Sequence, residues 1–268
     1  MSYYTTLLFV VESTPCKRGL KSVLLSCLLL WIPLWSDILL PPKKTYQIGV
    51  CIMANSCCDA HVQSLIDSAR RFFCPHHRVT FFLFCQHSLI AEAPDLIKIH
   101  QPTLGWPYDF LKRFQVYDEH KELFQDMEFI FAIDPGMVFV TDVEDEVLSD
   151  LIATQHASTI TKKSCYQMPL LKKRKNCSTQ IFYSGRFYGG RTQQFLELIK
   201  VLQQKVNADL AQNYIPRWHD ESYLNWYFTN HKPTKILSPS YCYPEGWHLN
   251  CPKKIISVVK RHPTQKED

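Results

Sequence analysis

The sequence predicts an α/β domain with a mostly parallel central sheet flanked by helices. Three short apolar runs, at 47–53, 78–85 and 128–133, are rich in β-branched and aromatic residues, which is typical of buried strands. A helical pattern separates the first two runs, and further helical patterns follow the third. Strands that alternate with helices favour parallel pairing, because each connection crosses back over the sheet.

The expected elements follow one another along most of the chain. After the strand at 47–53, Asp59 opens a helix with one apolar face. The strand at 128–133 ends at Asp134-Pro135-Gly136. Ligands bind beyond the carboxyl ends of such strands, so Met53–Cys58 and Asp134–Gly136 are expected beside a site. The remaining expected elements are helices over 110–124, 192–206 and 220–229 and a strand over 137–141.

The first 44 residues contain a long hydrophobic stretch that the rest of the chain lacks, which predicts a segment 1–44 and a main domain 45–268. Residues 22–40 are almost entirely apolar, and a membrane helix needs about 20 such residues. Basic residues before this run predict a single-pass membrane protein with a cytoplasmic N-terminus, anchored by an N-terminal hydrophobic helix. Pro33 and Asp37 weaken this interpretation. The alternative is a peripheral hydrophobic helix on a cytoplasmic protein.

The composition restricts the classes of partner. Hydrophobic residues make up 46% and charged residues 21% of the chain, which indicates a globular rather than a disordered protein. The formal net charge of +5 is too small to indicate a nucleic-acid partner, but it suits an anionic ligand such as a nucleotide diphosphate. The chain has 11 cysteines but no CxxC pair, so a zinc ribbon is not indicated.

The run WHDESYLNWYF at 218–228 is the most distinctive motif. On physical grounds alone, Asp220 can cap a helix and Glu221 suits its first turn, where the helix dipole favours an acid. Adjacent residues on a helix point in different directions, so these side chains do not predict a metal site by themselves. A purely structural helix start therefore competes with a catalytic interpretation.

The same motif carries a resemblance to a known family. Together with KPTKILSP at 232–239, LGWP at 104–107 and YPEGW at 243–247, it is similar to the signature of glycosyltransferase family 6, which includes the blood-group A and B transferases and bacterial relatives. The likeness covers residues 47–262. It implies the GT-A fold, a UDP-galactose or UDP-N-acetylgalactosamine donor, a glycan acceptor, and α1,3 transfer with retention of configuration.

The resemblance also implies a role for each matching residue. Glu221 would be catalytic, on the face of the sugar opposite the leaving diphosphate, as nucleophile or as stabiliser of an oxocarbenium-like state. Asp220 would bind sugar hydroxyls, and Arg113 would contact the donor through its several N–H groups. The remaining donor or acceptor residues would be Trp218, His219, Trp106, Ser184, Gly185, Arg186, Met53, Ala54, Asn55 and Asp134.

Three positions depart from the family pattern. Vertebrate members end their strand in Asp-x-Asp, which holds Mn²⁺, whereas this chain has Asp134-Pro135-Gly136. A divalent ion wants several oxygen ligands, so we expect no required metal, although the resemblance leaves Mn²⁺ on Asp134 as the alternative. Arg186 stands where the family has a small residue beside the donor sugar, and Cys58 stands where it has a tyrosine that stacks on uracil. These departures keep a second hypothesis open: a catalytically impaired protein of the same fold that binds sugar or protein.

Overall fold

The computed structural model describes residues 44–54, 59–159 and 181–258, and the residues from Thr45 onward form one compact unit. The predicted anchor at 22–40 and most of the segment 1–44 lie outside the described residues, so the domain boundary and the anchor stay predictions. Among the helices that the structure describes, none is long and apolar enough to cross a membrane.

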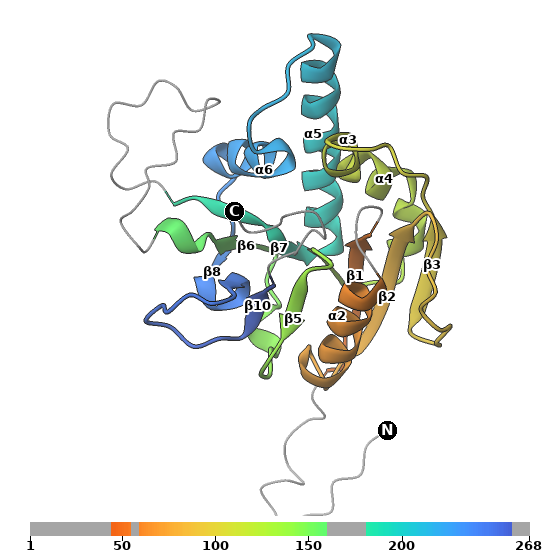
Figure 1. The fold of residues 1–268 in the computed structure, drawn as a ribbon, viewed down its shortest axis with the longest axis vertical. Coiled ribbons are helices and arrows are strands. Elements are labelled where there is room, and N and C mark those ends of the chain that lie inside the picture. The colour runs from red at the N-terminus through yellow and green to blue at the C-terminus, as the bar shows by residue number, and fades with distance from the viewer. Residues whose placement is uncertain (1–43, 55–58, 160–180, 259–268) are drawn as a thin grey trace, which may run out of the picture. The chain divides into compact units, whose positions relative to one another are not determined.

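A seven-stranded mixed sheet organises this unit (Figure 1). Its order is β3-β2-β1-β4-β7-β6-β8, and β1 (Gln47–Met53) pairs in parallel with β2 (Arg78–Cys85) and β4 (Phe129–Ile133). The edge strand β3 (Leu96–His100) also pairs in parallel with β2. The prediction of an α/β domain with a mostly parallel sheet is confirmed.

The exception to parallel pairing is β7 (Tyr183–Arg191), which the sequence patterns did not predict as a strand. It runs antiparallel to both β4 and β6 (Leu151–Gln155), and β6 in turn pairs in parallel with β8 (Lys235–Leu237). At Gly189 and Gly190 the backbones of the neighbouring strands lie so close that an added Cβ would collide with them. The Gly-Gly pair is therefore required for β7 to fit between its neighbours.

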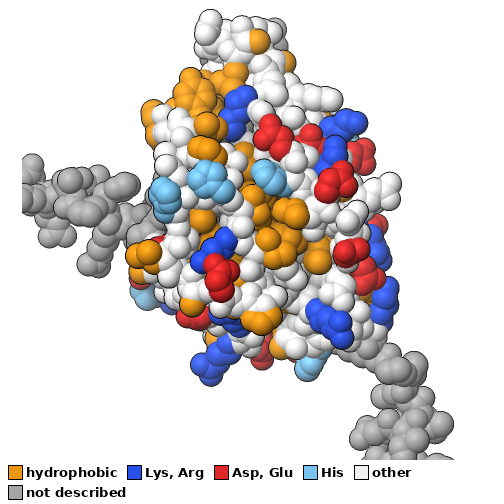
Figure 2. All heavy atoms as spheres, turned by 90° about the vertical axis from the view of Figure 1, so that its right-hand side faces the viewer, with side chains coloured by type: hydrophobic (Ala, Val, Ile, Leu, Met, Phe, Trp, Pro, Cys, Tyr) orange, Lys and Arg blue, Asp and Glu red, His pale blue; other side chains and the backbone are white. Residues whose placement is uncertain are grey.

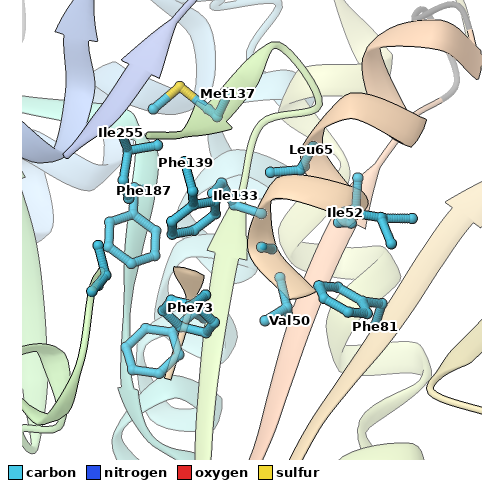
Figure 3. Packing of buried hydrophobic residues seen from close by; sticks show 14 of the residues in the cluster. Val50, Ile52, Leu65, Phe73, Phe81, Ile133, Met137, Phe139, Phe187 and Ile255 are labelled. Carbon is cyan, nitrogen blue, oxygen red and sulfur yellow. The ribbon is translucent and has the colours of Figure 1, made fainter. Parts of the chain in front are cut away.

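Strand alternation divides the apolar residues between two cores. On one face, Val50 and Ile52 pack against α2 (Asp59–Phe72) and against the small sheet β5-β10-β9, as Figure 3 shows with Leu65, Phe139 and Ile255. The strands of the small sheet are β5 (Met137–Phe139), β9 (Tyr243–Pro244) and β10 (Ile255–Ser257).

On the other face of the large sheet, Cys51 and Met53 pack under the remaining helices. These helices are α3 (Tyr108–Leu111), α4 (Arg113–Glu119), α5 (Thr192–Ala211) and α6 (His219–Asn230). Figure 1 shows α2 and the pair α4–α5 on opposite sides of the sheet. Successive side chains of a strand thus belong to different cores, because they point alternately to the two faces of the sheet.

Two expected helices have different bounds in the structure. The segment 110–124, predicted as one helix, is divided into α3 (Tyr108–Leu111), α4 and a 3-10 turn at Lys121–Phe124. The chain turns at Lys112 and His120, so each short helix buries its own apolar side chains, such as Leu111 and Phe124. The helix predicted over 192–206 continues to Ala211, and Asn213 follows it with φ of 56°, a left-handed conformation common after helix ends.

Charges of both signs are interspersed on the face that Figure 2 shows. Hydrophobic and histidine side chains occupy the middle of this face, with acidic and basic side chains around them. This face therefore presents no broad field of one sign.

Candidate active site

The candidate site includes a three-residue bulge in β7. Ala153 of β6 pairs with Tyr188, but the next residue, Thr154, pairs with Ser184, so residues 185–187 have no partner on β6. The Thr154 hydroxyl donates to the Phe187 carbonyl (2.8 Å) and closes the bulge. Bulges re-aim side chains and occur often beside active sites. This one brings Gly185 against the start of α6.

Glu221 faces this bulge from α6. The backbone N–H of Gly185 donates to Glu221 Oε2 at 3.0 Å. A Cβ at position 185 would lie 3.4 Å from the Glu221 Cβ and 3.6 Å from Asp220 Oδ2, so position 185 is within van der Waals contact of both acids. Burial raises the pKa of Glu221 to about 7, although the Gly185 N–H opposes that rise. The carboxyl group is thus close to its titration point at neutral pH.

Arg113 joins the strand end to the same helix. Its Nη1 lies 3.1 Å from Asp134 Oδ1 and 3.2 Å from Asp220 Oδ2, and the arginine is only 4% exposed. Burial opposes the charge on Arg113, but the two carboxylates outweigh it and hold the pKa of Arg113 above its ordinary value. The ion pairs therefore bring together Arg113, Asp134 and Asp220, residues that are far apart in the sequence.

Asp220 does not cap the helix, which corrects the expectation from its position in the motif. Helix α6 begins one residue earlier, with Trp218 at the N-cap and His219 at φ of 45°. The Asp220 side chain is buried and pairs with Arg113 instead. Burial raises the pKa of Asp220 to about 6, although Arg113 opposes that rise.

Asn225 fixes the geometry between α6 and β7, and sequence reasoning gave it no role. Its amide oxygen accepts from the Tyr183 N–H (2.8 Å), and its amide nitrogen donates to the carbonyls of Tyr183 (2.7 Å) and Glu221 (2.8 Å). The side chain is buried, so these bonds replace water. The available signal was its position four residues after Glu221, one helical turn away.

Tyr188 lies beneath the ion-pair network and was also not predicted as a site residue. Its side chain is fully buried, and neither its hydroxyl nor the Nε of Arg113 has a hydrogen-bond partner among the described residues. The charges of Arg113, Asp220 and Asp134 all act on the Tyr188 hydroxyl, while burial raises its pKa strongly. Tyr188 therefore stays a neutral phenol under the acids.

Ser184 and Arg186 flank Gly185 on the bulge. The Ser184 hydroxyl contacts the buried Cys242 sulfur at 3.3 Å, and burial raises the pKa of Cys242 to about 11. Arg186 is half-buried, and its charge acts on Glu221 and on His156, a histidine that sequence reasoning missed. Burial is the larger cause of the lowered pKa of His156, and Arg186 adds to it.

Trp218 and His219 lie at the start of α6, and Trp106 contacts His219. Trp106 is 75% exposed, and its ring stands edge-on to His219 with 5.2 Å between the ring centroids. Burial lowers the pKa of His219. The Arg217 guanidinium lies over the Trp218 ring, with 5.2 Å from the guanidinium carbon to the ring centroid.

Two of the other residues predicted to bind the donor or acceptor lie in the packed cores. Met53 and Ala54 lie at the end of β1, each 8% exposed and packed in the two cores, and the Ala54 N–H donates to the Phe84 carbonyl (2.9 Å). Asn55 and Cys58 lie outside the described residues.

The acids present do not fit the Mn²⁺ site of the vertebrate family members. Asp134 already pairs with Arg113, and Gly136 has no side chain to replace the second carboxylate. Across the described ranges, no group of three or more His, Cys, Asp or Glu side chains could hold a metal ion. Hard divalent ions need several oxygen ligands, so one ion-paired carboxylate is insufficient.

The fold and the cluster together define a class of protein. In this α/β domain a half-buried carboxyl group lies beside an arginine–carboxylate network near the carboxyl ends of the strands. This arrangement suits chemistry at a sugar carbon, because carboxyl groups stabilise the positive charge that develops there. The model of glycosyltransferase family 6 matches residues 39–267. The chain therefore belongs to glycosyltransferase family 6.

Curated relatives agree with the family. The human "Globoside alpha-1,3-N-acetylgalactosaminyltransferase 1" is 27% identical over 74% of this chain and 61% of its own length. The rat "Histo-blood group ABO system transferase 2" is 26% identical over 82% of this chain and 71% of its own length. The Escherichia coli "O-antigen biosynthesis glycosyltransferase WbnI" is 32% identical over 56% of this chain and 67% of its own length. The match thus spans less than two thirds of the length of the human relative.

Proposed function

We propose that this protein is a retaining hexosyltransferase of the GT-A fold, which moves galactose or N-acetylgalactosamine from a UDP-sugar to a glycan acceptor in α1,3 linkage. The observation that carries the proposal is the placement of Glu221 against the Gly185 N–H at 3.0 Å, with Asp220 and its arginine beside it. The name of the human relative supports N-acetylgalactosamine as a transferred sugar and the α1,3 linkage, and the name of the rat relative supports a transferase.

In the proposed reaction, the bond between the anomeric carbon and the donor phosphate breaks, and the electron pair leaves with UDP. The acceptor hydroxyl oxygen bonds to the same carbon from the face that UDP leaves, and its proton passes to the departing phosphate. Glu221 lies on the opposite face, as nucleophile or as stabiliser of the positive charge that develops at that carbon. Retention follows because both steps use one face.

The neighbouring residues would orient the reactants. Asp220 would accept hydrogen bonds from sugar hydroxyls through the oxygen that Arg113 leaves free, and Gly185 would let the sugar approach both acids. Trp106, His219 and Trp218 would border the acceptor, since aromatic faces suit the apolar side of a sugar ring.

The comparisons do not support the alternative of a catalytically impaired protein. Asp134 and Asp220 are joined by ion pairs to Arg113, and the matched relatives carry the names of transferases. The altered residues at 58, 136 and 186 instead raise the question of how the donor is bound.

Calorimetric titration with UDP, UDP-galactose and UDP-N-acetylgalactosamine tests the proposal, followed by incubation with lactose and assignment of the new linkage by NMR. The expected result is binding of UDP and an α-linked product. A β-linked product would refute retention, and a wild-type protein that binds none of the three nucleotides would refute the donor class.

A further inference from the structure

The metal position of the family presents an electrostatic problem in this chain. A nucleotide diphosphate is strongly anionic, yet Asp134 and Asp220 already pair with the one buried arginine, and a third acid, Glu221, interacts with both of them. The charge of Arg113 is already divided between two carboxylates. A diphosphate would therefore meet an excess of negative charge unless another cation faced it.

Arg186 lies where such a cation would be needed. Its backbone carbonyl accepts from the Asp134 N–H (2.9 Å), and its own N–H donates to Ser184 Oγ (3.3 Å). These bonds hold Arg186 beside the strand end that carries the metal-binding carboxylates in vertebrate relatives. The bulge then places it next to Gly185, which contacts Glu221.

The side chain of Arg186 has unused binding capacity. It is half-buried, and within the described ranges its guanidinium forms no hydrogen bond and no ion pair. Arg191, at the other end of the same strand, pairs with Asp150 (3.0 Å). A guanidinium carries five N–H donors that match phosphate oxygens, so an unpaired one beside an acidic cluster suits an anionic ligand.

We propose that Arg186 binds the diphosphate of the nucleotide donor and supplies the positive charge that a divalent metal supplies in vertebrate relatives. The proposal rests on the proposed function and deepens it: donor binding in this chain does not depend on a metal. The charge of Arg186 also acts on His156 and helps to lower the pKa of that histidine, after burial.

Titration of UDP and of uridine into Arg186→Gln, Arg186→Lys and the wild type tests the proposal, each with and without EDTA. Uridine lacks the phosphates, so it separates diphosphate contacts from nucleoside contacts. Arg191→Gln is the matched control, because it removes an arginine from the far end of the same strand. Thermal unfolding of each variant verifies that it is folded.

The expected result is that Arg186→Gln weakens UDP binding about tenfold or more and leaves uridine binding unchanged, since charge-assisted hydrogen bonds are lost. Arg186→Lys should retain more UDP affinity than Arg186→Gln. EDTA should not change the UDP affinity of either variant. Wild-type UDP affinity in Arg186→Gln would overturn this inference but leave the proposed function standing. Tighter UDP binding by Arg186→Gln would also overturn it, because it would show that Arg186 obstructs the site. Loss of UDP binding in EDTA would overturn it too. If the wild type binds no UDP, the proposed function falls, and the inference falls with it.

Discussion

Asn225 binds both backbone groups of Tyr183, with 2.8 Å from the Tyr183 N–H to its amide oxygen and 2.7 Å from its amide nitrogen to the Tyr183 carbonyl. The same amide nitrogen reaches the Glu221 carbonyl (2.8 Å). One buried side chain thus joins the first residue of β7 to the helical turn that carries Glu221. The distance between Glu221 and Gly185 depends on this connection.

Asn225→Asp should destabilise the protein by about 2–4 kcal/mol, because it removes both donors and buries a carboxylate near carbonyls. Thermal unfolding measures the effect, at about 2–4 °C per kcal/mol for a domain of this size. Thr229→Val, one turn further along α6, removes only a local bond to the Asn225 carbonyl and is the control. A wild-type unfolding temperature for Asn225→Asp would show that the connection is dispensable.

Stability should depend on pH through Glu221. Its pKa in the folded protein is raised to about 7 from an ordinary value of 4.5, so the folded state holds a proton that the unfolded state releases between these values. The stability that this proton confers is fully present below pH 4.5 and is lost as the pH rises through about 7.

Glu221→Gln should therefore be more stable than the wild type at pH 8, by on the order of 1–2 kcal/mol, and similar to it at pH 4.5. Urea unfolding at both values measures the difference, with the exposed Glu122→Gln as control. Equal stability of Glu221→Gln and the wild type at pH 8 would contradict the assigned burial cost.

Tyr188→Phe should leave stability unchanged or raise it by about 1 kcal/mol. The Tyr188 hydroxyl is buried without a hydrogen-bond partner among the described residues, so its removal relieves a desolvation cost. Denaturant unfolding measures the change. A clear loss of stability would mean that an internal water joins this hydroxyl to Arg113 Nε, which also lacks a partner in the described part of the chain.

The parallel half of the fold could be predicted from sequence because its strands are continuous apolar runs. The runs at 47–53, 78–85 and 128–133 became β1, β2 and β4 within a residue of their predicted bounds. Strand β7 was not predicted, because its glycines and its bulge break the alternation that marks a strand. Its place between β4 and β6 depends on tertiary fit at Gly189 and Gly190, which no local pattern reveals.

The candidate site, like the fold, could be predicted from the sequence only in part. The motif and the family resemblance singled out Arg113, Asp134, Asp220 and Glu221, and the structure gathers them around the start of α6. Asn225 and Tyr188 were missed as site residues because their roles come from contacts between elements distant in the sequence. The predicted anchor at 22–40 and Asn55 lie outside the described residues and stay predictions.

The transfer rate of Glu221→Gln tests the central claim most directly. Glutamine keeps the size of the side chain and can still accept from the Gly185 N–H, but it loses the charge that stabilises the transition state. We expect the rate of sugar transfer to fall by roughly 10²–10³-fold, as for other single groups that stabilise transition-state charge, and UDP affinity to stay nearly unchanged. Glu221→Gln that transfers sugar at the wild-type rate would contradict the assignment of Glu221 as the catalytic carboxylate.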